Sequence, residues 1–244
     1  MVGSIVLNGT DANGTDAGDN IQLEDGSGDS GNIAMESGTG SYSAVNTPTK
    51  SELSGGTDDY AVTAGELDSG YGKFEDVESE DINLVLGGRG GGAGDTSSSQ
   101  DTHVTMLTTL VEKRRDCIAL VSPFRSATVG VSSSVTQTSN VVDAFDLCPS
   151  SSYVVYDSAY KYQYDKYNDV FRFVPMNGDT AGLCANTDNV ADAWFSPAGY
   201  NRGGVRNAIK LSYNPKKAER DQLYRARVNP VVNFPGQGVT LFGD

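Results

Sequence analysis

The sequence predicts an α/β fold in which a mostly parallel sheet is flanked by helices, preceded by an acidic, Gly/Asp-rich N-terminal segment that is partly β or disordered. Apolar runs of strand length, at 82–86, 117–121 and 153–157, alternate with stretches of helical periodicity. Composition also changes along the chain. Residues 1–100 hold 18 Asp and Glu against 3 Lys and Arg, a net charge of −15, whereas residues 101–244 hold the other 14 acids and 15 bases, a net charge of +1. We therefore expect an acidic, glycine-rich surface segment or insertion domain at 1–58 and an α/β domain at 59–244.

The segment 1–58 has short apolar runs between its glycine clusters, at 5–7, 21–23 and 33–35. They predict small strands joined by turns. Asp11, Asp16 and Asp19 offer the oxygen ligands that Ca²⁺ prefers, but their spacing matches neither an EF-hand loop nor a sustained calcium-binding repeat. We expect a flexible or loosely folded exterior segment, with calcium binding as the alternative.

Helix signals begin at the start of the second part of the chain. Thr63 and Glu66 have the spacing of a capping box, and an apolar helical face follows them. A second helix is predicted over 102–115, between the strand-like runs at 82–86 and 117–121. That strand–helix–strand order predicts a right-handed βαβ unit with parallel strands.

The remaining elements are expected between 124 and 234. After a Ser/Thr/Val-rich connection at 124–139, Asn140 is expected to cap a helix that runs through Leu147. Residues 160–164 and 170–174 alternate like the two strands of a hairpin. The later elements are a short helix from Asp179, a helix from Asn214-Pro215 to Arg225, and a strand at 228–234.

Composition argues against several classes of function. No apolar run reaches the roughly 18 residues that suggest a membrane helix, and a net charge of −14 disfavours nucleic acid as a partner. The cysteines Cys117, Cys148 and Cys184 form no C-x-x-C pair, so we expect buried free thiols rather than a metal or disulfide site. We expect no cofactor and no metal.

A glycine-rich loop at 87–94, within INLVLGGRGGGAGD, has six glycines in eight residues and contains the pattern G-x-G-x-x-A. Between a strand and a helix, that pattern is typical of a nucleotide-binding loop. Three features weigh against it: no Gly-Lys-Ser/Thr follows, the polar stretch Asp95–Asp101 precedes the predicted helix, and Asp95 would repel a phosphate. We expect a mobile surface loop, with a nucleotide-dependent enzyme as the alternative.

His103 is the only histidine, so a Ser-His-Asp triad would have to use it. It lies just inside a predicted helix start, and no G-x-S-x-G motif occurs. We expect a solvated or helix-capping side chain.

Tyr160, Tyr162 and Tyr164 alternate along one predicted strand. Rings in such a stripe fill cores and interfaces, or stack on sugars or bases, and we favour the first role.

One basic segment stands out in this acidic chain. From Arg202 to Arg227 there are eight bases and two acids, a net charge of +6. A solvated helix face explains this equally well, but the excess also fits an acidic protein surface as a partner. The bases are Arg202, Arg206, Lys210, Lys216, Lys217, Arg220, Arg225 and Arg227.

The stretch WFSPAGYNRGG, followed by YNPKKAERDQLY and VNPVVNFPGQGVTLFGD, resembles the tail sheath proteins of contractile-tailed bacteriophages of the myovirus type. Upstream, VEKRRDCIALVSP and residues 151–185 resemble the same family, and the likeness covers about 60–244. Residues 1–56 do not resemble the family's conserved part. The signature residues are Trp194, Pro197, Gly199, Asn201, Arg202 and Gly203.

The resemblance implies a conserved sheath domain whose topology is likened to subtilisin, without a catalytic triad and without enzymatic activity. It implies that other copies of the chain join it in a helical sheath around an inner tail tube, and that contraction drives the tube through the host envelope. Baseplate and tail terminator are further implied partners, and nucleic acid and membrane are not. The protein would reside in the virion tail after assembly in the host cytoplasm.

Two further expectations follow from the resemblance. The conserved domain is expected to be incomplete at its C-terminus in this chain. The basic residues become candidates for a surface that faces the tube or a neighbouring subunit: Lys216, Lys217, Arg220, Arg225 and Arg227. A surface-binding decoration carried by residues 1–56 is the remaining alternative.

Overall fold

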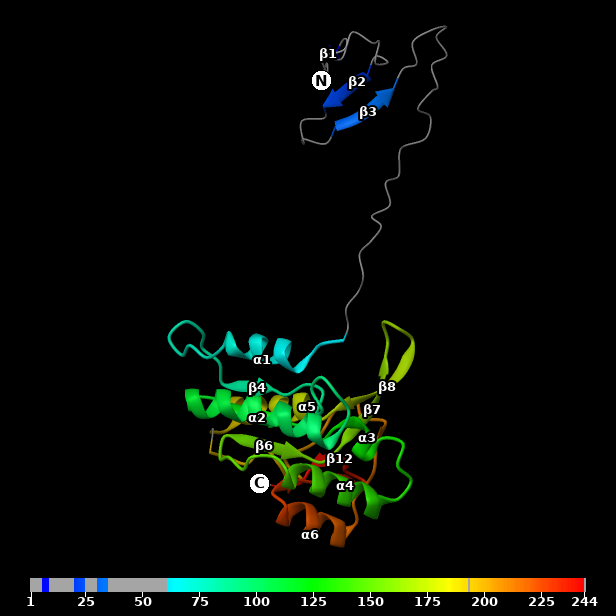
Figure 1. Cartoon of the computed structure of the whole chain (residues 1–244). Coiled ribbons are helices and arrows are strands. Elements are labelled where there is room, and N and C mark those ends of the chain that lie inside the picture. Colours follow the sequence, from blue (N-terminus) through cyan, green and yellow to red (C-terminus); the bar gives the residue numbers. More distant parts are fainter. Residues whose placement is uncertain (1–5, 9–19, 25–29, 35–60, 193, 244) are drawn as a thin grey trace. The chain divides into compact units, whose positions relative to one another are not determined.

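A computed structural model describes residues 6–8, 20–24, 30–34, 61–192 and 194–243 (Figure 1). The chain divides into two compact units, Met1–Asp58 and Asp59–Asp244. In the first unit, three antiparallel strands pair in the order β1-β2-β3 and overlap the apolar runs that predicted strands. The strands are β1 (Val6–Asn8), β2 (Asn20–Glu24) and β3 (Ser30–Ala34). The candidate calcium ligands Asp11, Asp16 and Asp19 lie outside the described residues.

The second unit is built around a four-stranded parallel sheet in the order β10-β6-β5-β4. Its strands are β4 (Leu84–Leu86), β5 (Ile118–Val121), β6 (Val154–Asp157) and β10 (Val228–Asn229). A mixed α/β fold with a parallel sheet flanked by helices was the predicted fold class, and the structure confirms it. The predicted βαβ unit is also present, because α2 connects β4 to the parallel β5.

Helices cover both faces of this sheet (Figure 1). One face, which includes Val85, Ala119 and Val121, joins a core with α2 (Ser97–Arg114), α4 (Ser134–Asp146) and α6 (Lys217–Arg225). The other face lies against α5 (Asn177–Val190), which contacts β4, β5 and β6. Fully buried Leu107 and Leu223 belong to the first core, and burial of each such side chain contributes about 1.5–3 kcal/mol.

The helix α2 begins earlier than its apolar pattern predicts. The expected start was residue 102, but Thr96 caps a helix from Ser97, its hydroxyl accepting a hydrogen bond from Ser99 N at 3.1 Å. The serines of the first turn have a low intrinsic preference for helix, so the sequence resembles a loop until the cap is recognised. The preceding α1 (Ala64–Gly72) carries the predicted capping box between Thr63 and Glu66.

The region 124–139 is more helical than expected. It contains the short α3 (Arg125–Thr128), and α4 starts at Ser134 behind the cap residue Ser133 rather than at Asn140. The prediction was wrong because Gln137 and Thr138 are polar in sequence but buried in the fold, which continues the buried face of the helix beyond its apolar residues.

A three-stranded antiparallel sheet in the order β8-β7-β9 contains the predicted hairpin. Its strands are β7 (Tyr160–Asp165), β8 (Val170–Pro175) and β9 (Lys210–Leu211). A second hairpin, β11 (Val231–Phe234) with β12 (Gly238–Leu241), packs nearby in a separate core that includes Met176, Leu211 and Leu241.

Three predicted boundaries near the C-terminal half differ from the structure. The strand expected at 228–234 is divided at Pro230, which has no N–H to donate, so β10 joins the parallel sheet and β11 joins a hairpin. The helix α5 starts at Asn177 and is longer than the short helix predicted from Asp179. The helix α6 ends at Arg225 as expected, but it starts at Lys217 rather than at Asn214-Pro215, because the Asn214 side chain pairs with the backbone of Asn233 instead of capping a helix.

Candidate functional site

The glycine-rich loop is packed against the carboxyl end of β5. Gly87 N donates to Leu120 O at 2.9 Å, and the Asn177 side-chain amide donates to Gly88 O at 2.6 Å. A Cβ atom on Gly90 would lie 2.1 Å from the carbonyl oxygens of both Ser122 and Pro123. Gly87, Gly90 and Gly91 are buried whereas Gly88, Arg89 and Ala93 are exposed, so the predicted surface loop lies only partly at the surface.

The same loop does not present a phosphate cradle. The sequence predicted that the polar stretch 95–101 separates the loop from the next helix. In the structure α2 starts at Ser97, so most of that stretch is already helical and the gap is absent. The glycines instead lie against protein atoms: a Cβ on Gly92 would lie 2.8 Å from the His103 ring. Asp95 is also engaged, because its carboxylate accepts a hydrogen bond from Ser126 N at 3.0 Å, one residue into α3.

His103 is buried in α2, with 1% of its surface exposed. Its Nε2 lies 2.8 Å from Gly87 O, and since a carbonyl only accepts, Nε2–H is the donor. Burial lowers the pKa of His103, so the ring is neutral near pH 7. The expectation of a solvated or helix-capping histidine is wrong: the ring ties α2 to the end of β4.

A buried carboxyl group lies at the carboxyl end of β6. Asp157 is 1% exposed, and its Oδ2 accepts a hydrogen bond from Ser122 Oγ at 2.7 Å. Ser122 Oγ in turn accepts from Asn177 N at 2.9 Å. Burial raises the pKa of Asp157 to about 8, so the carboxyl group is mostly protonated at pH 7. The described partners of Ser122 do not include His103, and these groups therefore form a structural hydrogen-bond chain rather than a triad.

The signature loop, residues 194–203, is anchored to β12 by its glycines. Gly199 N donates to Leu241 O at 2.9 Å and Leu241 N donates to Gly203 O at 2.8 Å. Gly199 has a φ of +90°, and a Cβ on Gly203 would lie 2.4 Å from Leu241 O. These two positions require glycine because of backbone conformation and close approach.

Some of the other signature residues make contacts within the loop, and others are exposed to solvent. Arg202 Nε donates to Ser196 O at 2.9 Å, and its guanidinium lies 5.0 Å from the Phe195 ring centroid. Pro197 is half-buried, whereas Asn201 and Trp194 point to solvent, with Trp194 80% exposed. The signature loop therefore exposes aromatic rings, of which Trp194 is the most exposed.

The basic candidates do not form one uniform patch. Lys217 and Arg225 lie on the solvent side of α6, two turns apart, with Asp221 between them. Lys216 precedes the helix and is exposed. Arg220 is half-buried and donates to Pro215 O at 3.3 Å. Arg227 lies beyond the helix, where it donates to Ser150 Oγ.

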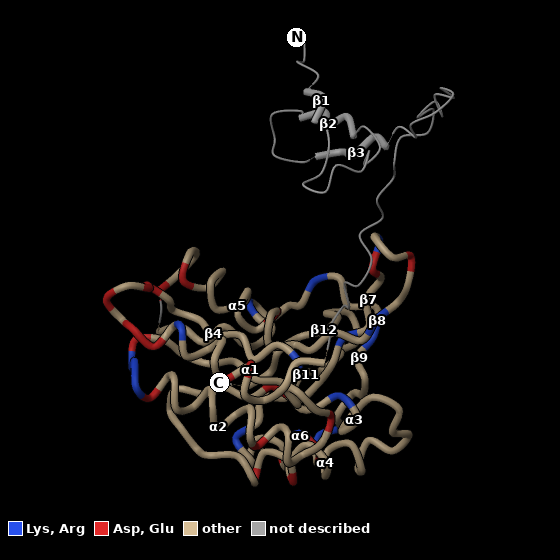
Figure 2. The backbone as a smooth tube through the Cα atoms, turned by 45° about the horizontal axis from the view of Figure 1, so that its top comes forward, with Lys and Arg blue, Asp and Glu red and all other residues tan. Residues whose placement is uncertain are grey.

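Acidic residues gather in the loop that follows α1 (Figure 2). Arg114, whose side chain has no exposed surface, bonds to this loop from inside. The Arg114 guanidinium donates to Phe74 O at 2.6 Å and Glu80 O at 2.7 Å, and it pairs with Asp116 at 2.8 Å. The exposed acids of this loop are Glu75, Asp76, Glu78, Glu80 and Asp81. One buried arginine therefore fixes the backbone of a loop that the acids would otherwise repel apart.

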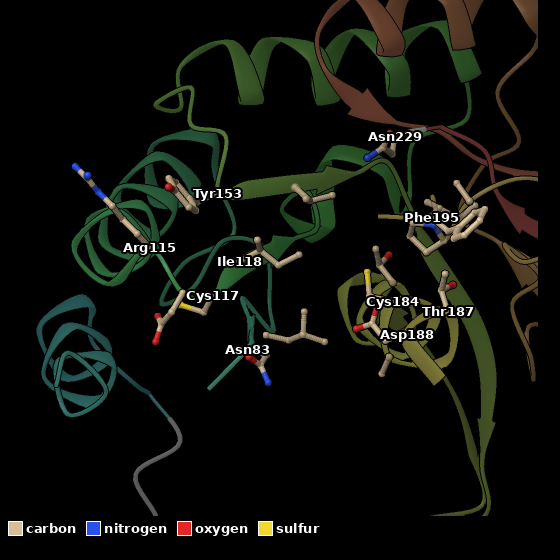
Figure 3. Close-up of a pocket in the computed structure, with 18 residues that line it drawn as sticks. Asn83, Arg115, Cys117, Ile118, Tyr153, Cys184, Thr187, Asp188, Phe195 and Asn229 are labelled. Atoms are coloured by element: carbon tan, nitrogen blue, oxygen red, sulfur yellow. The ribbon is translucent and has the colours of Figure 1, made fainter. Parts of the chain in front are cut away.

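A cavity of about 750 Å³ lies between α5, the amino ends of the parallel strands and the signature loop (Figure 3). Cys117 and Ile118 line one side, and Cys184, Asp188 and Phe195 line the other. Cys117 is buried, Cys148 and Cys184 are half-buried, and all three are free thiols. Within the described residues, no group of three or more His, Cys, Asp or Glu side chains could hold a metal ion. Nor does any helix in that part of the chain have the length and apolar content to cross a bilayer.

Residues 61–244 match the model of a family described as the phage tail sheath protein central domain. The chain is 43% identical over 206 residues to the tail sheath protein of Enterobacteria phage T4, covering 79% of this chain and 30% of the relative. It is 38% identical over 202 residues to the tail sheath protein of Vibrio phage KVP40, covering 78% of this chain and 30% of the relative. The chain thus spans about a third of the length of these relatives.

Solved structures show the same fold at lower identity. One is the baseplate of the anti-feeding prophage, with a TM-score of 0.53 and 14% identity over 75% of this chain and 42% of that one. Another is the contracted helical sheath of the same particle, with a TM-score of 0.52 and 14% identity over 76% of this chain and 44% of that one.

Proposed function

We propose that this chain, which belongs to the phage tail sheath protein family, forms part of a contractile tail sheath. The observation that carries the proposal is the match of the family's central domain to residues 61–244, together with 43% identity to a tail sheath protein. Copies of the protein polymerise into a helical sheath around the inner tail tube, and contraction drives the tube through the host envelope. The baseplate and the tail terminator contact the two ends of the sheath. The sheath resides in the virion after assembly in the host cytoplasm.

The proposed role is structural rather than enzymatic. Its energy would come from contacts between subunits that rearrange on contraction, so it needs no bound nucleotide. The packing of the glycine-rich loop supports this, because Gly90 and Gly92 lie against protein atoms where a nucleotide loop would leave room for phosphate. His103 also supports a structural role, because its Nε2–H donates a hydrogen bond to Gly87 O inside the fold.

The two compact units suggest different roles within that structure. We assign the family's sheath role to the α/β unit, residues 59–244, because it contains the whole of the matched region, 61–244. The unit at 1–58 carries 9 Asp and Glu against one Lys, and it suits a surface segment or an insertion domain.

Electron microscopy of the purified protein tests the main proposal. Assembly into hollow tubes, or incorporation into the outer layer of a tail, is the expected result. A protein that stays monomeric under conditions that polymerise the related sheath proteins would contradict it.

We further propose that the outer side of α6 faces the inner tube, since basic side chains there suit an acidic partner surface. The change is Lys217→Glu with Arg225→Glu, which reverses the two bases that α6 presents to solvent. We expect weaker co-assembly with the tube protein, and a larger loss at low salt than at high salt because exposed charges are screened. Lys166→Glu, at an exposed base in the β7–β8 turn, is the matched control. Equal co-assembly of all three proteins would remove α6 from the tube contact.

A further inference from the structure

An aromatic face lies on one side of the β7–β8 hairpin. It consists of Tyr162, Tyr164, Phe171 and Phe173, which alternate along the two strands and lie opposite one another in register. Ring centroids are 4.7 Å apart for Tyr162 and Phe173 and 5.1 Å apart for Tyr164 and Phe171. Tyr164 and Phe171 remain 47% and 52% exposed. The stripe that began at buried Tyr160 therefore continues as a ladder of rings open to solvent.

The rim of the aromatic face beside β9 is basic. Lys210 Nζ lies 4.8 Å from the Tyr162 ring centroid. At the turn end of the face, the Tyr164 hydroxyl donates to Asp169 Oδ1 at 2.7 Å, so the positive charge of the face lies at its β9 side. Rigid aromatic rings with a neighbouring cation have the composition of energetically dominant residues in protein interfaces.

A second exposed aromatic surface has acids on its N-terminal side. Trp194 is 80% exposed beside Phe195, with ring centroids 6.2 Å apart. Asp188 and Asp192 are exposed just before it, whereas the Arg202 guanidinium lies over Phe195 on the other side. The protruding Trp194 ring, with Asp192 beside it, is thus available to complement the aromatic face and the Lys210 ammonium at its edge.

We infer that the aromatic face of the hairpin binds the Trp194 loop of a second copy of this chain. The inference rests on the proposed function, since it names one contact of the helical assembly. The two surfaces differ, so a copy can offer its face to one neighbour and its loop to another. Such a heterologous contact repeats head to tail and produces a ring where the rotation closes and an open helical assembly where it does not. It also brings opposite charges together in a chain whose net charge of −14 makes its copies repel one another.

The contact is a part of the interface rather than all of it. One aromatic side chain buries about 150–250 Å², so the exposed rings of the two surfaces account for several hundred Å². A specific interface buries about 1,200–2,000 Å² in total, and the remainder must come from other surfaces. Central, well-packed rings nevertheless carry a large share of the binding energy, so losing one has a measurable effect on assembly.

Charge reversal followed by mixing tests the inference on the purified protein. Lys210→Glu places an acid opposite Asp192 of the next copy, and Asp192→Lys places a base opposite its Lys210. Each variant alone is expected to polymerise at least tenfold more weakly than the unchanged protein, measured as the critical concentration in sedimentation. An equimolar mixture is expected to recover most of the assembly, because in alternating copies every contact again pairs an acid with a base.

Two further proteins complete the experiment. Trp194→Ala is expected to lose assembly as well, whereas Tyr167→Ala, which removes an 87% exposed tyrosine from the turn of the same hairpin, should assemble normally. Unfolding midpoints of all variants should match that of the unchanged protein, since every changed side chain is exposed. Single variants that assemble normally, or a mixture that does not recover, would overturn the inference and leave the proposed function standing. An unchanged protein that does not polymerise would overturn the proposed function and this contact with it.

Discussion

The buried carboxyl group of Asp157 provides the sharpest test of the fold. It lies where the parallel sheet meets the antiparallel hairpins, and its Oδ atoms accept hydrogen bonds from Ser122 Oγ at 2.7 Å and from Ala159 N at 3.4 Å. Burial is the main cause of its raised pKa of about 8, and the neighbouring Asp179 adds to the shift. The perturbation is Asp157→Asn, which keeps the shape of the group but removes its titration.

The sign of the pH effect follows from proton binding. Between about pH 4 and pH 8 the folded protein keeps the Asp157 proton that the unfolded chain releases, so stability falls as the pH rises through this window. With the pKa raised from 3.8 to about 8, at about 1.4 kcal/mol for each pKa unit, the upper limit of the effect is roughly 6 kcal/mol. Relaxation and water penetration reduce that value. Relative to the unchanged protein, the Asp157→Asn variant should therefore become steadily more stable from pH 5 to pH 9.

Urea unfolding at pH 5, 7 and 9 measures this difference. Asp146→Asn, at an exposed carboxylate near the end of α4, is the control for a general loss of negative charge. The reasoning would be refuted if Asp157→Asn and the unchanged protein lost the same free energy of unfolding between pH 5 and pH 9.

Two other predictions concern the loops around the sheet. Gly90→Ala should lower the free energy of unfolding by about 1–3 kcal/mol or more, since its Cβ would lie 2.1 Å from two backbone oxygens. Gly182→Ala in α5, where no atom lies within 4 Å, should instead stabilise by about 0.5–1 kcal/mol, and similar effects of both would contradict the packing argument. Arg114→Lys should speed hydrogen exchange at residues 74–81, since an ammonium cannot bridge Phe74 O, Glu80 O and Asp116 together. Unchanged exchange there would show that the guanidinium does not hold the loop.

The parts of the fold that sequence predicted are those fixed by local chemistry. The capping box at Thr63 and Glu66 needs only two side chains three residues apart, and the hairpin of β7 and β8 follows from alternation around a polar turn. The parallel βαβ unit follows from strand-length apolar runs on both sides of one helix. In each case the stabilising partner is close in sequence or dictated by connectivity.

The parts that sequence missed depend on distant partners. His103 is buried because Gly87 O, 16 residues away, accepts its Nε2–H. The spacing in the sequence could have indicated this burial. His103 lies one turn before Leu107, so a predicted helix that started earlier would have placed both side chains on the same buried face. The early starts of α2 and α4 were hidden for a related reason, since buried Gln100 and Gln137 look like surface residues until their partners are known.

The same physical requirement explains why the glycine-rich loop resembles a nucleotide site and why it need not be one. Both uses demand residues without a Cβ because something approaches the backbone closely. In a dinucleotide site that neighbour is pyrophosphate, whereas here it is the end of β5 beneath Gly90 and the His103 ring beneath Gly92. Because protein atoms occupy the space next to Gly90 and Gly92, a phosphate cannot approach the backbone at these two positions. In the proposed sheath role, this packed connection would hold β4 and α2 in a fixed arrangement without any bound ligand.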